Sequence, residues 1–268
     1  MNISVVIRNK NEAESLEFLL EVLQNKYRED IAEVIVIDNL SSDSSEEICD
    51  RFNAKFISVK NFSYGGSANI AAEEASHEIV VIFSAHSYPV SHDFFKIIKA
   101  KFLNSDGKLA GLRCIHNNAD YRIYLKDISS YESPNSGGLI FSGSAFSRDI
   151  WKKHWFNHNV QTFEDKEWSM RMLEMGYSIQ VVPSIFSYYV KRSQKQLFFR
   201  FKNDTIGGYQ IFDEKPSVKS ACIKFTLFFV KGLPELFLAI YYNFRRLSFI
   251  VFLRIRGIHK YKLRRLIE

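Results

Sequence analysis

The sequence predicts an α/β fold in which a mostly parallel sheet is flanked by helices, followed by a helical extension at the C-terminal end. Two observations predict the α/β part: short apolar runs rich in Val and Ile recur early in the chain, and segments with helical spacing stand between them. A third observation, the change to an aromatic and basic composition after residue 216, predicts the extension. We therefore expect a first domain over residues 1–216 and an amphipathic basic helical extension over residues 217–268.

The apolar runs are typical of parallel strands buried on both faces, and we expect such strands at residues 3–7, 34–37, 56–59 and 79–83. Helical spacing predicts helices at residues 12–24, 44–52 and 67–76. Ser41 or Ser42 is expected to cap the second of these helices. Strand–helix alternation with short connections favours right-handed crossovers and a parallel sheet.

The second half of the first domain is less regular. Residues 107–136 have mixed polarity and predict loops and antiparallel strands. Residues 139–146 are apolar but are interrupted by Ser142-Gly143-Ser144. A helix is expected from about Asp165 to Met175, ended by Gly176, since glycine is common just past the end of a helix.

The overall composition is that of a globular protein. The 268 residues are 46% hydrophobic and 25% charged, which provides enough apolar material for a sizeable core. The three cysteines are an odd number without metal-ligand spacing, which argues against a disulfide framework and favours a reducing compartment. The N-terminus begins directly with the strand-like NISVVI, so we expect no secretory signal and a cytoplasmic location.

The net charge of +6 is concentrated near the C-terminal end. Residues 245–268 hold eight Lys or Arg and one acidic residue, a net +7, so the rest of the chain carries about −1. The basic residues alternate with Phe, Ile and Leu, which favours docking on anionic phospholipid over binding of nucleic acid. We expect an anionic membrane surface as a partner and no nucleic acid.

Within the extension, Gly232 and Pro234 interrupt the apolar pattern and predict two separate amphipathic helices. No apolar run approaches the roughly 18–20 residues that span a bilayer. We therefore expect these helices to lie in the interface, peripherally on the inner face of the cell membrane. The alternative is that they pack against the first domain and extend its core.

Polar clusters follow three of the expected strands: RNKNE at residues 8–12, Asp38-Asn39, and SAHS at residues 84–87. Parallel α/β sheets bind ligands beyond the carboxyl ends of their strands. These clusters therefore mark the expected ligand edge of the sheet.

Four motifs in order resemble the family 2 glycosyltransferases, which have the GT-A fold. They are SVVIRNKNEAESL, VIVIDNLSSDSS, FSYGGSANIAAEEASHEIVVIFSAHSYP and FEDKEWSMRMLEMGY, and the resemblance extends over residues 3 to about 205. It implies a Rossmann-like GT-A domain that transfers a sugar from a nucleotide-diphosphate sugar to an acceptor hydroxyl.

The resemblance assigns a set of residues to the donor: Arg8, Asn11, Glu12, Asp38, Asn39, Gly65, Asn69, Ser84, Ala85 and His86. Asp38 would accept a hydrogen bond from the base, or instead cap the following helix. Arg8 would bind phosphate bidentately, or instead form a surface pair with Glu12. Gly65 and Asn69 match a Gly-x-x-x-Asn pattern that brings backbone and amide to the nucleotide, or are only a turn and a polar helix residue.

The acidic pair Glu164-Asp165 is the expected catalytic group. Direct transfer with inversion needs one carboxylate to take the proton of the acceptor. In the family this role falls to the Asp, which implies Asp165 as the base and Glu164 as the residue that orients the acceptor, or as the base if the register differs by one. Alternatively both are ordinary carboxylates of a first helical turn. Trp168 would line the acceptor site or belong to the core.

The segment Ser84-Ala85-His86-Ser87 departs from the family, which usually has Asp-x-Asp here to chelate Mg²⁺ or Mn²⁺. Ser187-Tyr188-Tyr189 also stands where the family commonly has a histidine ligand. Three interpretations follow. His86 donates to the diphosphate while Lys191 and Arg192 replace the metal charge; or His86 is a single ligand of a weakly held metal; or the site binds a sugar nucleotide without turnover.

We therefore expect an inverting glycosyltransferase that acts on a glycan or polyprenyl-linked acceptor in the synthesis of cell-surface polysaccharide. One alternative is a catalytically inactive protein that binds sugar nucleotides. A less favoured alternative is a nucleotidyltransferase, which would need a glycine-rich, basic phosphate loop near the first strand, and RNKNEAES lacks one.

Overall fold

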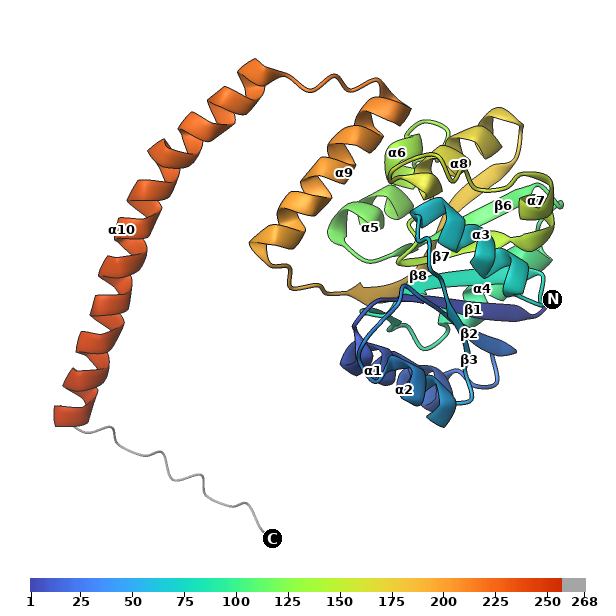
Figure 1. Cartoon of the computed structure of the whole chain (residues 1–268), viewed down its shortest axis with the longest axis horizontal. Helices are drawn as coiled ribbons and strands as arrows, with labels where there is room; N and C mark the ends of the chain where they lie inside the picture. The colour runs from blue at the N-terminus through green and yellow to red at the C-terminus, as the bar shows by residue number, and fades with distance from the viewer. Residues whose placement is uncertain (257–268) are drawn as a thin grey trace, which may run out of the picture. The chain divides into compact units, whose positions relative to one another are not determined.

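The computed structural model describes residues 1–256. The chain separates into two compact units, Met1–Glu214 and Lys215–Glu268. Figure 1 shows the first unit as helices packed around a central sheet, and the described part of the second as one long helix.

A sheet of eight strands organises the first unit, in the order β3-β2-β1-β4-β7-β6-β8-β5. The strands β3, β2, β1 and β4 are parallel, β7 is antiparallel to both of its neighbours, β6 and β8 are parallel, and β5 is antiparallel to β8. The expected α/β fold with a mostly parallel sheet is thus confirmed. The strands are β1 Ile3–Asn9, β2 Glu33–Asp38, β3 Lys55–Ser58, β4 Ile79–Ser84, β5 Ser87–Pro89, β6 Leu109–Ile115, β7 Gly143–Ser147 and β8 Ser178–Tyr188.

The helices of this unit form two layers, because alternate strand residues point to opposite faces of a sheet. Val5 and Ile7 of β1 belong to the core that contains α1, α2 and α4, whereas Val6 belongs to the opposite core with α3, α7 and α8. Trp168 is fully buried in that second core. The helices are α1 Ala13–Lys26, α2 Ser45–Arg51, α3 Tyr64–Glu74, α4 Phe94–Leu103, α5 Asn118–Leu125, α6 Pro134–Gly137, α7 Arg148–Lys153, α8 Glu164–Glu174 and α9 Gln194–Phe212.

The register of β1 brings the polar strand ends together. Asn9 is opposite Asp38 of β2, and Arg8 is opposite Ser84 of β4. The chain continues to β2 and β3 on one side of β1 and returns on the other side at β4, so a topological switch point lies between β1 and β4. A ligand site is favoured at this edge of the sheet.

Two local expectations for the first unit are wrong. Neither Ser41 nor Ser42 caps α2, whose N-cap is Ser44; the Ser41 hydroxyl instead donates to Asp38 at 2.6 Å. In the middle of the chain β6 pairs antiparallel with β7, as expected, but residues 118–125 form the helix α5, where no helix was expected. The helix begins because Asn117 accepts hydrogen bonds from the backbone of the first turn, which is a strong start signal.

The second unit contains the helix α10, Val218–Arg256, which runs without a break through Gly232 and Pro234. The expectation of two helices is wrong because a proline removes one donor and crowds the preceding turn, at a cost of about 3 kcal/mol, but does not by itself require a break. Within residues 1–256, no helix is long and apolar enough to cross a membrane. The basic residues from 257 to 268 lie outside the described part of the chain.

Candidate active site

A cavity of about 530 Å³ opens at the carboxyl ends of β1 and β4. The turn after β4, the start of α8, the segment after β8 and one side of α9 form its walls. The structure brings together here six of the residues expected to form the site, namely Arg8, Glu12, Ser84, His86, Glu164 and Asp165. The other expected donor residues do not line this cavity.

Arg8 holds Glu164 at one wall of the cavity. Its Nη1 donates to Glu164 Oε1 at 2.9 Å, and its Nη2 donates to the carbonyl oxygen of Phe141 at 3.0 Å. The guanidinium also lies over the ring of Tyr64, 5.7 Å from its centroid. The alternative pairing of Arg8 with Glu12 is therefore not formed. Burial and the neighbouring Asp165 raise the pKa of Glu164, while Arg8 opposes this shift.

Asp165 is held by the backbone and not by a cation. Its Oδ2 accepts from the N–H of Phe141 at 3.0 Å, and its Oδ1 accepts from the N–H of Lys166 at 2.8 Å. A carboxylate offers about four lone-pair positions, so capacity remains for a substrate hydroxyl. Phe163, directly before the helix, has φ +68, a left-handed conformation that few non-glycine residues adopt and that often marks functional sites.

Hydrogen bonds of Ser87 hold the turn after β4, and His86 of this turn lines the cavity. The Ser87 hydroxyl accepts from the N–H of Ser84 at 3.0 Å and lies 2.6 Å from the Ser142 carbonyl oxygen. Ala85 is buried beneath the turn and donates its N–H to the carbonyl oxygen of Arg8.

The imidazole of His86 is neutral at pH 7. Burial, followed by the nearby charges of Arg192 and Arg8, lowers the pKa of His86 to about 4. Its ring packs edge-on against Tyr188, with 5.2 Å between centroids. Its Nδ1 is buried and has no hydrogen-bond partner within the described residues. The imidazole as a whole is only half-buried and lines the cavity.

The cavity does not fit a divalent metal. Within residues 1–256 there is no group of three or more His, Cys, Asp or Glu side chains that could hold an ion. Mg²⁺ and Mn²⁺ prefer several oxygen ligands, whereas the turn from Ser84 to Ser87 offers hydroxyls and one imidazole. Of the two carboxylates at the start of α8, Glu164 is paired with Arg8, and Asp165 accepts two backbone hydrogen bonds.

The residues at the ends of β1 and β2 bind one another. Asp38 is 1% exposed, and its carboxylate accepts from Asn9 Nδ2 at 2.9 Å and from the backbone and hydroxyl of Ser41. The carbonyl oxygen of Asn39 accepts from Lys10. Both oxygens of Asp38 thus accept hydrogen bonds from within the chain, and the expected contact with the base stays a prediction.

Asn11 belongs to the same network. Its side-chain oxygen accepts from the N–H of Ser42 at 2.8 Å, and its backbone adopts φ +49. It joins the loop after β1 to the loop after β2, in place of the expected nucleotide contact.

Gly65 and Asn69 have packing roles in α3, and the nucleotide contact expected for them stays a prediction. A Cβ at Gly65 would lie 2.3 Å from the carbonyl oxygen of Asn157, so glycine is required for close helix packing. The Asn69 amide accepts from the Trp151 indole and the Phe156 N–H and donates to the Phe156 carbonyl oxygen, all at 2.9 Å. Both residues fasten α3 to the segment that precedes α8.

A buried polar network under the cavity was not expected from the sequence. Arg113 of β6 binds Asp120 of α5 through two nitrogens, and Asp120 also binds His116. Burial opposes ionisation of Asp120, but the hydrogen bonds from His116 and Arg113 lower its pKa to about 2. Lys166 donates to the Gly138 carbonyl oxygen at 2.9 Å, and burial lowers its pKa to about 8. The lone arginine in the apolar run LAGLRCI was the available signal.

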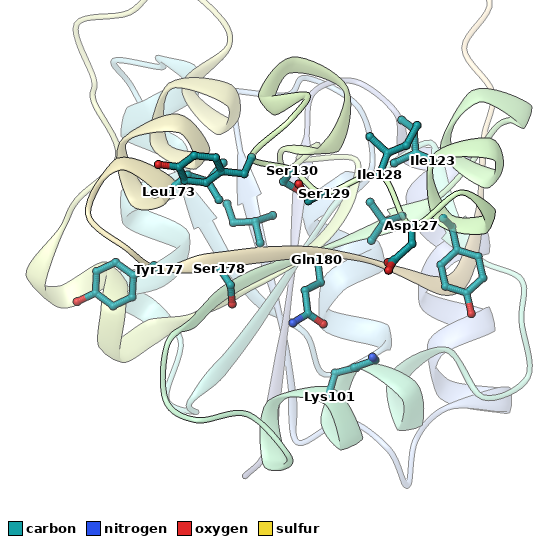
Figure 2. Close-up of a pocket in the computed structure, with 14 residues that line it drawn as sticks. Lys101, Ile123, Asp127, Ile128, Ser129, Ser130, Leu173, Tyr177, Ser178 and Gln180 are labelled. Atoms are coloured by element: carbon teal, nitrogen blue, oxygen red, sulfur yellow. The ribbon is translucent and has the colours of Figure 1, made fainter.

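A second pocket, of about 480 Å³, lies against the outer part of β8 (Figure 2). Lys101 of α4 and Gln180 of β8 point into it from below, and Asp127, Ser129 and Ser130 come from the loop after α5. None of the expected site residues lines it. This second pocket therefore contributes nothing to the candidate chemistry.

Solved structures of similar fold are glycosyltransferases. The mannosyltransferase PcManGT from Pyrobaculum calidifontis, in complex with GDP-Man and Mn²⁺, matches 81% of this chain with a TM-score of 0.63 at 17% identity, and the chain covers 65% of its length. Glucosyl-3-phosphoglycerate synthase from Mycobacterium tuberculosis, with Mn²⁺, UDP and phosphoglyceric acid, matches 81% of this chain and 80% of its own at TM-score 0.57 and 15% identity. The structure of S. aureus TarS in complex with UDP-GlcNAc matches 72% of this chain and 60% of its own length, with a TM-score of 0.55 and 16% sequence identity.

The fold is therefore the GT-A fold of these structures. The family model described as glycosyl transferase family 2 matches residues 4–163, and the chain belongs to this family. A relative from Methanococcus voltae, 24% identical over 74% of this chain and 70% of its own, is named dolichyl N-acetyl-alpha-D-glucosaminyl phosphate 3-beta-D-2,3-diacetamido-2,3-dideoxy-beta-D-glucuronosyltransferase.

Proposed function

We propose that this chain is an inverting glycosyltransferase that moves a sugar from a nucleotide-diphosphate sugar to a hydroxyl of a glycan or lipid-linked acceptor, in the synthesis of a cell-surface polysaccharide. The acceptor oxygen forms a bond to the anomeric carbon while the bond from that carbon to the diphosphate oxygen breaks. Asp165 takes the hydroxyl proton, and the nucleoside diphosphate leaves. Attack opposite the leaving group inverts the configuration.

One observation carries this proposal: a single cavity is lined both by Arg8, Ser84 and His86 at the strand ends and by the carboxylate pair at the start of α8. A donor bound at the strand ends of a parallel sheet, as such sheets favour, would therefore share the cavity with both carboxylates. The family membership and the sugar nucleotides in the similar solved structures support a sugar nucleotide as this donor.

The two carboxylates have different roles in the proposed reaction. Glu164 is buried and its Oε1 is paired with Arg8, so this carboxylate is less accessible to an acceptor. Asp165 is half-buried at the cavity wall and retains lone pairs for an acceptor hydroxyl. We therefore assign the base to Asp165, and the support of the cavity wall to Glu164.

The variant Asp165→Asn tests the base. It should keep the affinity for a nucleoside diphosphate within about threefold while the transfer rate falls by about 10²–10⁴-fold, the usual contribution of a positioned general base. Binding is measured by calorimetry, and transfer by release of nucleoside diphosphate. The control Glu174→Gln changes an exposed carboxylate at the other end of α8 and should transfer at the wild-type rate. Near-normal transfer by Asp165→Asn would remove this assignment.

We place the protein peripherally on the cytoplasmic, anionic face of the membrane, with α9 beside the cavity. The outward face of α9 exposes Phe198, Phe201 and Tyr209 at 62%, 63% and 54%. Lys202 lies over the ring of Phe198. Exposed aromatic rings mixed with lysine are typical of helices that lie in a lipid interface.

The helix α10, described by itself, also exposes aromatic and basic side chains. It has no buried residue, and it exposes large apolar side chains along its whole length. Within Val218–Arg256 the sequence has seven Lys or Arg and one acidic residue, Glu235. A long basic and aromatic helix favours an anionic lipid surface, and a membrane location is what a lipid-linked acceptor requires.

A further inference from the structure

Resting on the proposed function, we infer that this chain holds the diphosphate of its donor with Arg192 and His86, in place of a divalent metal. The similar solved structures of the mannosyltransferase and the synthase contain Mn²⁺. The same region of this chain offers nitrogen donors for an anion and not oxygen ligands for a cation.

The carboxylates that line the cavity are all engaged within the chain. Glu164 binds Arg8, and Asp165 accepts from two backbone N–H groups. Asp204 binds Arg200 at 3.2 Å, and Glu12 accepts from the hydroxyl of Ser15 at 3.3 Å. Each of these carboxylates therefore has at least one oxygen committed to a partner within the chain before any ligand binds.

The arginine side chains Arg8 and Arg192, which both line the cavity, differ in how many hydrogen bonds they make within the chain. Arg8 is fixed by Glu164 and the Phe141 carbonyl oxygen. Arg192, within the described part of the chain, makes one hydrogen bond, from Nη2 to the Tyr188 hydroxyl at 2.8 Å. A guanidinium has five N–H donors in a planar fork that matches two phosphate oxygens, so most of the donors of Arg192 remain for an anion.

His86 and Arg192 are connected through one side chain. The ring of Tyr188 packs on the ring of His86, and its hydroxyl receives the hydrogen bond from Arg192. The buried Nδ1 of His86 has no partner in the described residues, and burying such an atom without a hydrogen bond is unfavourable. Because the His86 side chain lines the cavity and is half-buried, a rotation of its ring would bring this nitrogen to a diphosphate oxygen as donor, while the guanidinium of Arg192 balances the negative charge.

The guanidinium groups of Arg8 and Arg192 make the electrostatic potential of the cavity more positive. A divalent cation between Arg8 and Arg192 would be repelled by both guanidinium groups. The same two charges attract the diphosphate, and they continue to stabilise it as negative charge develops on the leaving group. Lys191 is adjacent in sequence, but it is exposed and does not line the cavity, so it is not part of the site.

The test is calorimetry of UDP, GDP and dTDP binding to the full chain, first in EDTA and then with excess Mn²⁺. The nucleotide that binds should do so with the same affinity, within about threefold, under both conditions. Arg192→Gln should weaken it by about tenfold or more, the loss expected for a charge-assisted hydrogen bond. The matched control Lys191→Gln should stay within about threefold of the wild type.

A second variant introduces metal-binding carboxylates at the turn after β4. Ser84→Asp combined with His86→Asp places two carboxylates at the turn and should make nucleotide binding depend on Mn²⁺. If this double variant fails to fold by circular dichroism, the comparison of Arg192→Gln with Lys191→Gln still decides the matter.

Three outcomes would overturn the inference. Binding by the wild type that disappears in EDTA and returns with Mn²⁺ would show a metal site, and the proposed transferase would survive. Equal affinity in Arg192→Gln and Lys191→Gln would remove Arg192 from the site. No binding of any of the three nucleotides under either condition would overturn both the inference and the proposed function.

Discussion

At the scale of single residues, the adjacent carboxylates of Glu164 and Asp165 have different hydrogen-bond partners and therefore different roles. Glu164 is buried against Arg8, whereas Asp165 is held only by backbone N–H groups. The sequence could predict that the pair opens a helix at the site, because its position before an amphipathic segment is visible. It could not predict the division of roles, because the partner Arg8 is 156 residues away in the chain.

The same limit applies to Asp38 and Asn69. A polar residue at a strand end or on a helix has the same pattern in sequence whether it faces a ligand or a neighbour. Asp38 is satisfied by Asn9 and Ser41, and Asn69 by the segment after α7. Both are parts of the framework that positions the cavity, and the nucleotide contact expected for each stays a prediction.

His86 should make the folded protein less stable in mild acid. Its pKa is lowered from 6.5 to about 4, so between these values the unfolded chain binds a proton that the folded chain does not. Stability is therefore lost as pH falls from about 6.5 to 4, by at most about 1.4 kcal/mol per pH unit for one proton. His86→Asn should flatten this slope, as measured by thermal unfolding at intervals of pH.

The control for this measurement is His92→Asn, which changes an exposed imidazole. It should keep the wild-type slope between pH 6.5 and 4. An identical slope in His86→Asn and the wild type would mean that the imidazole is not buried as described.

At the scale of elements, the strands and helices up to residue 84 followed from simple patterns. Continuous Val and Ile runs and leucines at helical spacing occur there without interruption. Antiparallel strand was expected within residues 107–136, but not the bounds of β6, whose run contains Arg113; in the folded chain Asp120 compensates this charge. The helix α10 was expected to break at Pro234, but local propensity alone does not decide where a long helix ends.

The packing of α3 gives a test at this scale. A Cβ at Gly65 would meet the backbone of Asn157 at 2.3 Å, and a backbone atom cannot rotate away. Gly65→Ala should therefore destabilise the first unit by about 1–3 kcal/mol, the usual cost of overpacking, in chemical denaturation. In the control Gly66→Ala the nearest contact is the flexible side chain of Ser63, so the loss should be smaller. Equal losses would contradict this account of α3.

At the scale of the whole molecule, the GT-A domain could be recognised from motif order, while its membrane contact depends on which residues remain exposed. Helical spacing alone does not distinguish an apolar face that packs on a core from one that faces lipid. The described structure leaves the apolar residues of α10 and the outward face of α9 uncovered within their own units.

Binding to vesicles tests this membrane contact. The full chain should sediment with vesicles of anionic phosphatidylglycerol more than with zwitterionic phosphatidylcholine, because basic residues near a membrane each contribute about 1 kcal/mol. Deletion after Pro216 should lower the bound fraction, and Phe198→Ser with Phe201→Ser should lower it further. The control Tyr131→Ser changes an aromatic ring that is 70% exposed on a loop. Unchanged sedimentation of the deletion variant would count against docking by α10.

The contact between α9 and the segment before α8 has one more consequence. A Cβ at Gly207 would lie 2.6 Å from the Thr162 side chain and 2.9 Å from the ring of Phe163, so α9 packs directly on the two residues that precede Glu164. The helix cannot slide along this contact without moving the beginning of α8. A displacement of α9 at a membrane surface would thus be passed to the turn that carries Glu164 and Asp165.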